Sequence, residues 1–153
     1  MEEQVTERMI IRGTPDECYG VLTAFERYPE WAADIKSVSI DERDSQGRAS
    51  RVTFRAAAFG RSTSYTLLYE YGAAPFELSW VQVDGDITRR LDGSYQLASS
   101  DDDSTEIVYH LVVDLKVPLP GFVKRRAESR IMGTALRELK AWVERPPATS
   151  MPG

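Results

Sequence analysis

Residues 117–144 decide the fold of this chain, and they read VPLPGFVKRRAESRIMGTALRELKAWVE. From Gly121 to about Glu144, apolar residues recur at spacings of three and four, which predicts one long amphipathic helix. A helix of about 24 residues is roughly 36 Å long, which is the width of a whole domain of this size. Its apolar stripe must therefore lie on the rest of the chain. The stripe consists of Phe122, Val123, Ala127, Ile131, Met132, Ala135, Leu136, Leu139, Trp142 and Val143.

The sequence before this helix is dominated by alternating apolar and polar residues, the pattern of β-strands that bury one face. The connections between the alternating segments are short, and short connections join antiparallel neighbours. Asp84-Gly85 predicts a tight turn, and Gly93 predicts a bulge or a bend inside a strand. The expected strands are Ile35–Arg43, Ala49–Ala58, Ser62–Tyr71, Phe76–Val83, Ile87–Ala98 and Thr105–Val117.

The N-terminal segment predicts one more strand, over Val5–Arg12, and two short helices. Thr14-Pro15-Asp16-Glu17 has the pattern of a capping box with proline at the first helical position, so a helix is expected to begin there and to reach Phe25. A second short helix is expected over Glu30–Asp34. This order predicts an α+β fold. A curved antiparallel sheet of about seven strands wraps around the long C-terminal helix, and the two short helices lie between strands 1 and 2. We expect residues 1–144 to form a single ligand-binding domain and residues 145–153 to form a disordered tail.

Composition narrows the classes of function. The chain has 153 residues and a net charge of −5, whereas a general nucleic-acid binder is more often basic, so we expect no nucleic-acid partner. No apolar run is long enough to span a membrane, and the first residues lack the apolar core of a signal peptide. The single cysteine, Cys18, fits a reducing compartment, so we expect a cytoplasmic protein. One histidine and one cysteine leave no metal-ligand cluster, and we expect neither a metal nor a cofactor.

The sheet face that is expected to meet the long helix carries many tyrosines, and each buried hydroxyl needs a hydrogen-bond partner. By alternation Gln82 and Arg89 lie on the same face, where an unpaired arginine is costly. A cavity with an apolar wall and a few polar groups explains this set. A filled core whose polar side chains reach solvent at its rim is the alternative. The candidate ligand-binding residues are Trp31, Phe54, Tyr65, Leu67, Tyr69, Leu78, Trp80, Gln82, Arg89, Tyr95, Tyr109, Leu111 and Met132.

The sequence assigns no catalytic residue. His110 has the opposite parity to Tyr109 and Leu111, so we expect its side chain to point away from the cavity. Cys18 lies on the apolar stripe of the first helix, where a free cysteine packs as a small apolar side chain.

Two surfaces have the composition of interaction sites. The start of the long helix places basic side chains beside apolar ones, which favours docking on an anionic membrane surface, the alternative being a solvated helix face. This candidate membrane patch comprises Leu119, Phe122, Lys124, Arg125 and Arg126. Apolar residues on the outer parity of the strands favour a homodimer interface, although single exposed apolar residues are also normal. They are Leu68, Val81, Val83, Val108 and Val112.

Several strings of the sequence, taken in order, resemble the START-like helix-grip (SRPBCC) superfamily. Within it the chain is most similar to the polyketide cyclase/dehydrase and lipid-transport group, which includes coenzyme Q-binding proteins. The resemblance covers about residues 3–144. The strings are Thr14-Pro15-Asp16-Glu17, Tyr28-Pro29-Glu30-Trp31, Pro75-Phe76-Glu77-Leu78-Ser79-Trp80, Leu91-Asp92-Gly93-Ser94-Tyr95 and residues 118–126.

The resemblance implies a hydrophobic cavity between sheet and long helix and a small hydrophobic ligand such as a lipid, a quinone or a polyketide. Three hypotheses follow. The first is a module that binds or transports such a molecule. The second is a polyketide aromatase/cyclase-dehydratase, in which Arg89 stabilises an enolate and a tyrosine moves a proton. The third is a non-catalytic interaction module with a filled core.

Overall fold

The computed structural model describes residues 3–58, 61–72, 76–101, 103–116 and 133–145. The elements follow the predicted order, the strands β2 and β3 match their predicted bounds residue for residue, and the other strand ends differ by at most two residues. A C-terminal helix covers residues 133–143. The other elements are β1 (Glu3–Arg12), α1 (Pro15–Thr23), a 3-10 turn (Phe25–Arg27), α2 (Tyr28–Trp31), β2 (Ile35–Arg43), β3 (Ala49–Ala58), β4 (Arg61–Tyr71), β5 (Glu77–Gly85), β6 (Thr88–Ser99) and β7 (Ser104–Leu115).

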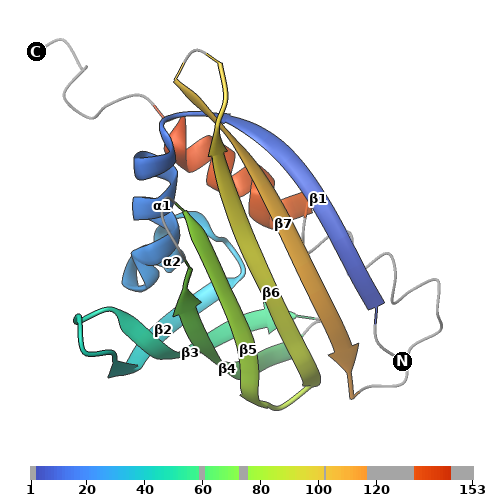
Figure 1. Cartoon of the computed structure of the whole chain (residues 1–153). Coiled ribbons are helices and arrows are strands. Elements are labelled where there is room, and N and C mark those ends of the chain that lie inside the picture. Colours follow the sequence, from blue (N-terminus) through green and yellow to red (C-terminus); the bar gives the residue numbers. More distant parts are fainter. Residues whose placement is uncertain (1–2, 59–60, 73–75, 102, 117–132, 146–153) are drawn as a thin grey trace, which may run out of the picture.

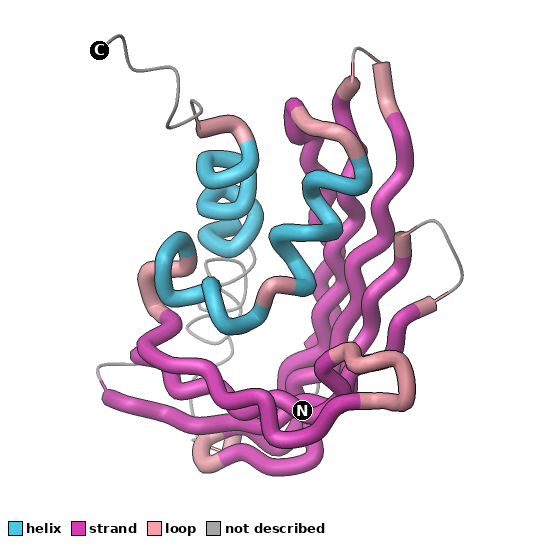
Figure 2. The backbone as a smooth tube through the Cα atoms, turned by 90° about the vertical axis from the view of Figure 1, so that its left-hand side faces the viewer, coloured by secondary structure: helices cyan, strands magenta, loops and turns pink. Residues whose placement is uncertain are grey.

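All seven strands form one antiparallel sheet in the order β1-β7-β6-β5-β4-β3-β2 (Figure 1). The sheet is strongly curved, so that β2, β3 and β4 run across below the helices while β5, β6 and β7 rise beside them (Figure 2). The helices α1 and α2 and the C-terminal helix all lie on its concave side (Figures 1 and 2). The predicted helix-grip architecture is therefore confirmed.

Helix α1 begins at the predicted capping box. The Thr14 hydroxyl accepts a hydrogen bond from the Glu17 backbone N–H at 3.2 Å, and the Glu17 carboxylate accepts one from the Thr14 backbone N–H at 3.2 Å. These two bonds satisfy donors that the first turn of a helix leaves free. Helix α2 runs over Tyr28–Trp31 rather than over the expected Glu30–Asp34, and Pro29 lies in its first turn, where the missing N–H of proline leaves no helical hydrogen bond unmade.

One end of the concave face is packed solid. Helix α1 contacts β6 and β7 there. The side chains that meet are small or aliphatic and almost without exposed surface. We call this region the closed end, and it consists of Ile11, Cys18, Leu22, Leu97 and Ile107.

Two local predictions in the β5–β6 hairpin are wrong. The strand β5 continues through Asp84 and Gly85, so the turn lies at Asp86 and Ile87 instead. Strand β5 also carries an extra residue, Val83, because Thr66 pairs with Asp84 while the next residue of β4, Leu67, pairs with Gln82. That insertion lengthens the strand beyond the turn that Asp84-Gly85 predicted.

Gly93 does not form a bulge. It pairs in regular register with Leu111 on one side and with Trp80 on the other. A Cβ atom at this position would lie 2.6 Å from Cζ2 of Trp80 and 2.6 Å from the carbonyl oxygen of His110. The glycine is therefore explained by the close approach of the Trp80 indole to the β6 backbone.

The bulge of β6 lies four residues earlier, at Arg89. Thr88 pairs with Leu115 and Arg90 with Asp114, which leaves Arg89 as the extra residue. A bulge restarts the alternation, so Thr88 and Leu91 both face the concave side although their spacing is odd. The Arg89 side chain is 59% exposed and lies 4.0 Å from the Asp114 carboxylate.

Several predictions concern residues outside the described part of the chain. These are the first half of the long helix, the candidate membrane patch and the tail from residue 146 onward. On the outer sheet face, Val81 and Val83 are exposed, whereas Val112 is only 7% exposed and does not belong to a surface patch. The homodimer remains a prediction. None of the helices in the described ranges has the length and apolar character that crossing a membrane requires.

Candidate functional site

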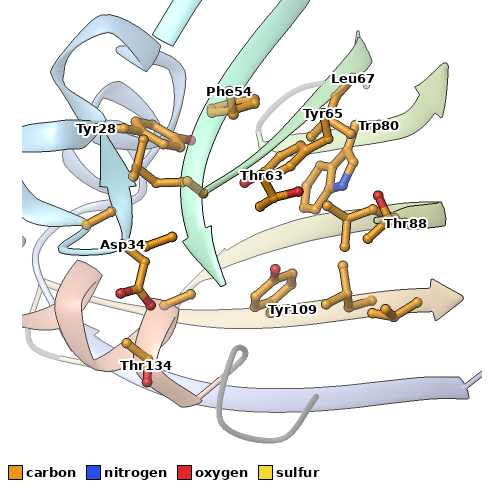
Figure 3. Close-up of a pocket in the computed structure, with 18 of the residues that line it drawn as sticks. Tyr28, Asp34, Phe54, Thr63, Tyr65, Leu67, Trp80, Thr88, Tyr109 and Thr134 are labelled. Carbon is orange, nitrogen blue, oxygen red and sulfur yellow. The ribbon is translucent and has the colours of Figure 1, made fainter. Parts of the chain in front are cut away.

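A cavity of about 210 Å³ lies between the concave face of the sheet and the C-terminal helix (Figure 3). Side chains of α2, of all strands from β2 to β7 and of the C-terminal helix line it. An apolar cavity of about 150 Å³ is large enough for benzene, so this cavity has room for a small organic molecule. Its lining comprises Tyr28, Trp31, Ala32, Asp34, Ile35, Phe54, Ala56, Ala57, Thr63, Tyr65, Leu67, Tyr69, Trp80, Ile87, Thr88, Leu91, Tyr95, Tyr109, Leu111, Val113, Leu115, Thr134, Ala135 and Glu138.

The structure brings most of the predicted ligand-binding residues together in this one cavity. Strand alternation places those on the strands correctly because it needs only the local period of two, and Trp31 belongs to α2. Nine of them line the cavity: Trp31, Phe54, Tyr65, Leu67, Tyr69, Trp80, Tyr95, Tyr109 and Leu111.

Of the other four predicted residues, three are not among the residues that line the cavity, and one lies outside the described part of the chain. Leu78 is fully buried in the core and does not reach the cavity, and Met132 lies outside the described residues. The Gln82 amide is occupied by Thr88: its nitrogen donates to the Thr88 carbonyl at 2.8 Å, and its oxygen accepts from the Thr88 hydroxyl at 2.5 Å. Arg89 was expected to face the cavity, which is wrong, because the bulge at this residue turns its side chain to the outer side.

Four tyrosines, three buried and one partly buried, give the apolar wall its polar groups. Tyr69, Tyr95 and Tyr109 are 8%, 9% and 6% exposed, and they line the cavity together with Tyr65. In Figure 3 the hydroxyls of Tyr65 and Tyr109 lie at the same open space. Burial raises the pKa of Tyr65, Tyr69 and Tyr109 because an ionised phenol is poorly solvated there, and Asp34 adds to the rise at Tyr65. At neutral pH these side chains are therefore protonated, and their hydroxyls can form hydrogen bonds with a polar group of a ligand.

Tyr95 and Tyr109 form a coupled pair on neighbouring strands. Their rings stack with centroids 4.5 Å apart. Burial raises the pKa of both, and a hydrogen bond between the hydroxyls adds to the rise at Tyr109 and opposes it at Tyr95. The Trp80 ring, 5.2 Å from Tyr95, holds the pair from the other side. This packing gives the Tyr109 hydroxyl a defined position in the wall.

Aromatic rings also surround the cavity at its α2 end. The ring of Tyr28 lies 4.9 Å from Trp31 and 5.9 Å from Phe54, and Phe54 stacks on Tyr65 at 5.3 Å. We call these four residues the aromatic box. The Tyr28 hydroxyl donates to the Leu22 carbonyl at 2.5 Å, which holds the α2 segment against α1. The Trp31 indole nitrogen is buried and has no hydrogen-bond partner among the described residues.

Two carboxylates line the same end of the cavity, and neither was predicted. Asp34 follows α2, and Glu138 belongs to the C-terminal helix. The Glu138 carboxylate accepts a hydrogen bond from the Ala33 backbone N–H at 3.1 Å, which ties the helix to the connection between α2 and β2. The sequence did contain a signal for Glu138, because it follows Ala135 by three positions and so lies on the apolar stripe of the helix. No lysine, arginine or histidine lies among the described lining residues.

His110 and Cys18 lie outside the cavity. The His110 ring nitrogen Nδ1 is 2.8 Å from the Thr6 hydroxyl of the neighbouring strand. The Cys18 thiol is fully buried, and burial is the main cause that raises its pKa, which makes the reactive thiolate scarce. Among the residues that the structure describes, no group of three or more histidine, cysteine, aspartate or glutamate side chains is arranged to hold a metal ion.

The fold defines a class of protein, since a curved antiparallel sheet that encloses a cavity against a C-terminal helix is shared with START-like proteins. The structure superimposes on a START superfamily protein from Mycobacterium smegmatis with a TM-score of 0.88 and 22% identity, covering 93% of this chain and 97% of that one. The Zhui aromatase/cyclase from Streptomyces sp. R1128 is similar with a TM-score of 0.84 and 14% identity, over 98% and 99% of the two chains.

The family model for polyketide cyclase/dehydrase and lipid transport matches residues 11–140, and the chain belongs to this family. The structure also resembles the di-domain aromatase/cyclase BexL of the BE-7585A biosynthetic pathway, with a TM-score of 0.73 and 18% identity over 94% of this chain and 48% of that one. No curated protein sequence matches the chain.

Proposed function

We propose that this chain binds or transports a small, mainly apolar molecule in the cavity between the sheet and the C-terminal helix. The observation that carries the proposal is a cavity of about 210 Å³ whose aromatic wall contains buried tyrosine hydroxyls facing open space. A lipid, a quinone or a polyketide-like molecule fits this combination, because each joins an apolar body to a few oxygen acceptors.

Apolar contact would supply most of the affinity. Each 100 Å² of apolar ligand surface removed from water gains about 2.5 kcal/mol before the cost of ordering the ligand. Hydrogen bonds from Tyr65 and Tyr109 would then orient an oxygen of the ligand. A filled core, the third hypothesis, is less well supported, because it provides no occupant for the space that these hydroxyls face.

A polyketide aromatase/cyclase activity is the second candidate. It is favoured by the similarity to Zhui and BexL and by the defined position of the Tyr109 hydroxyl beside Tyr95. A tyrosine whose pKa is raised holds its proton and can act as an acid but not as a base at neutral pH. Arg89 has no part in this candidate mechanism, since its side chain lies outside the cavity.

Native mass spectrometry of the purified protein is the first test, followed by denaturing extraction of any bound molecule. A stoichiometric apolar compound would support binding and reveal its chemical class. Calorimetric titration with 2-naphthylmethanol, a neutral probe with one hydroxyl, tests the cavity directly. The proposal would be overturned if the protein carried no such compound and bound no probe.

Removal of a single hydroxyl locates the probe. Tyr109→Phe should lower the affinity for 2-naphthylmethanol by about three- to tenfold, the effect of one hydrogen bond. It should leave the affinity for 2-methylnaphthalene, which has no hydroxyl, unchanged. Tyr71→Phe is the matched control, because the Tyr71 hydroxyl donates to the Ala49 carbonyl at 2.7 Å and does not line the cavity. Arg89→Ala should change probe affinity less than twofold. A larger loss in Tyr71→Phe or Arg89→Ala than in Tyr109→Phe would contradict the assigned site.

A further inference from the structure

The α2 end of the cavity differs chemically from the rest of its wall. The four rings of the aromatic box line it and pack on one another in a row, with neighbouring centroids 4.9 to 5.9 Å apart. Asp34 lies at the edge of this region, between Tyr28 and Thr134 (Figure 3). The faces of aromatic rings carry partial negative charge, so the box and the carboxylate favour the same kind of group.

The two carboxylates of this end come from different elements and line the same cavity, with Asp34 exposed and Glu138 half-buried. The Glu138 carboxylate is hydrogen-bonded to the backbone of Ala33, the residue next to Asp34 in the chain. The Asp34 charge is felt inside the cavity, since it contributes to the raised pKa of Tyr65, after burial. Neither carboxylate forms an ion pair with another described residue.

No basic side chain lies among the described lining residues, and the nearby Lys36 ammonium donates to the Ala33 carbonyl at 3.0 Å. A ligand carboxylate or phosphate at this end would be placed beside two like charges, the exposed Asp34 and the half-buried Glu138. A protonated amine would instead meet two carboxylates and the aromatic rings of this end.

We propose that the α2 end of the cavity receives a nitrogen cation, so that the ligand is an apolar molecule bearing a protonated amine rather than a carboxylate. This inference rests on the proposed function, since it assigns the polar end of the molecule that the cavity holds. Asp34 and Glu138 bind the cation, and the aromatic box encloses it. The buried hydroxyls of Tyr69 and Tyr109 remain available to other polar atoms of the same ligand.

Three probes of one shape test the charge preference: 2-naphthylmethylamine, 2-naphthylmethanol and 2-naphthoate. Calorimetric titration of the full chain at neutral pH and low salt should show that the amine binds most tightly, the alcohol less tightly and the carboxylate most weakly. We expect at least a tenfold difference between successive probes. Asp34→Asn should remove most of the advantage of the amine and should change the affinity for the alcohol less than twofold. Glu138→Gln should have the same effect to a smaller extent, because glutamine retains the acceptor for the Ala33 N–H.

A matched control separates the local effect from the net charge of the protein. Glu70 is exposed and lies on the outer parity of β4, so Glu70→Gln removes one negative charge far from the cavity and should leave all three affinities unchanged. Trp31→Leu should lower the affinity for the amine more than the affinity for the alcohol, because it removes one aromatic ring of the box.

The outcomes distinguish the two proposals. If the alcohol binds but the amine binds no more tightly, or if the advantage of the amine survives both carboxylate substitutions, this inference is wrong and the proposed function stands. If none of the three probes binds, the proposed function fails and this inference fails with it.

Discussion

The closed end and the cavity end lie on the same concave face of one sheet, yet one is solid and the other is hollow. At the closed end Ile11, Cys18, Leu22 and Ile107 are each 0% exposed. At the other end Tyr69 and Trp80 are buried almost as well, at 8% and 6%, but they border a cavity of about 210 Å³.

The covering helix and the shape of the side chains account for this difference. Helix α1 has nine residues and lays Cys18 and Leu22 directly on β6 and β7. Helix α2 has four residues, all of them partly exposed or exposed, and cannot cover the sheet beyond a single turn. Large flat rings lean on one another, as Phe25 and Tyr69 do at 4.5 Å, and leave space that branched aliphatic chains would fill. Side chains on a sheet face can therefore be buried from solvent and still border a cavity.

Alkaline pH should destabilise the cavity end, and this is the largest effect that we predict. Burial raises the pKa of five tyrosines at this end, and an unfolded tyrosine ionises near pH 10. Their stabilising contribution is therefore complete below pH 10 and is lost as the pH rises above it, at about 1.4 kcal/mol per tyrosine and pH unit. We expect cooperative unfolding just above pH 10, with phenolate absorbance at 295 nm and loss of circular dichroism rising together. The tyrosines are Tyr28, Tyr65, Tyr69, Tyr95 and Tyr109.

Tyr109→Phe should move that transition to higher pH, because it removes one of the ionising groups. Full tyrosine ionisation near pH 10 with an intact circular dichroism spectrum would show that the cavity end is open to solvent, and it would contradict the comparison.

Truncation of an aliphatic side chain should cost more at the closed end than at the cavity. Ile107→Ala should lower the free energy of unfolding by about 2 to 5 kcal/mol, because tightly packed neighbours cannot fill the space left behind. Leu91→Ala should cost less than half as much, since Leu91 is partly exposed and already borders the cavity. Urea unfolding of both variants gives the two values. Equal losses would mean that the cavity end is as tightly packed as the closed end.

Two glycine substitutions probe the same contrast on a smaller scale. Gly93→Ala should lower the free energy of unfolding by about 1 to 3 kcal/mol, because its Cβ would overlap the Trp80 ring in the cavity wall. Gly20→Ala in α1 should raise it by about 0.5 to 1 kcal/mol, since nothing lies within 4 Å of a Cβ there and alanine favours the helix. Thermal unfolding followed by tryptophan fluorescence measures both. A neutral Gly93→Ala variant would mean that Trp80 moves freely and does not define the wall.

Local patterns were sufficient for most of the fold. The bounds of β2 and β3, the capping box at Thr14 and the buried parity of Phe54 and Trp80 all follow from the sequence, because each depends on residues within a few positions of one another. The same logic placed nine of the predicted ligand-binding residues on the cavity wall.

Long-range pairing set the limits of that prediction. Alternation placed Arg89 inside, but the register between β6 and β7 requires an extra residue there and turns it outward. Gly93 resembled a bulge because the sequence does not reveal that the Trp80 indole lies 2.6 Å from where its Cβ would be. Asp34 and Glu138, more than 100 residues apart, line the same cavity, and Glu138 binds the backbone of Ala33 beside Asp34.

The sequence by itself therefore determined the order of the elements, the curved antiparallel sheet and the face that each strand buries, because the periods of helices and strands are local properties of the chain. Only the tertiary structure decided that the buried face is solid beneath α1 and hollow beneath α2, and that two carboxylates join the aromatic box. Those features depend on how side chains from distant segments pack against one another, and local sequence patterns contain no information about that packing.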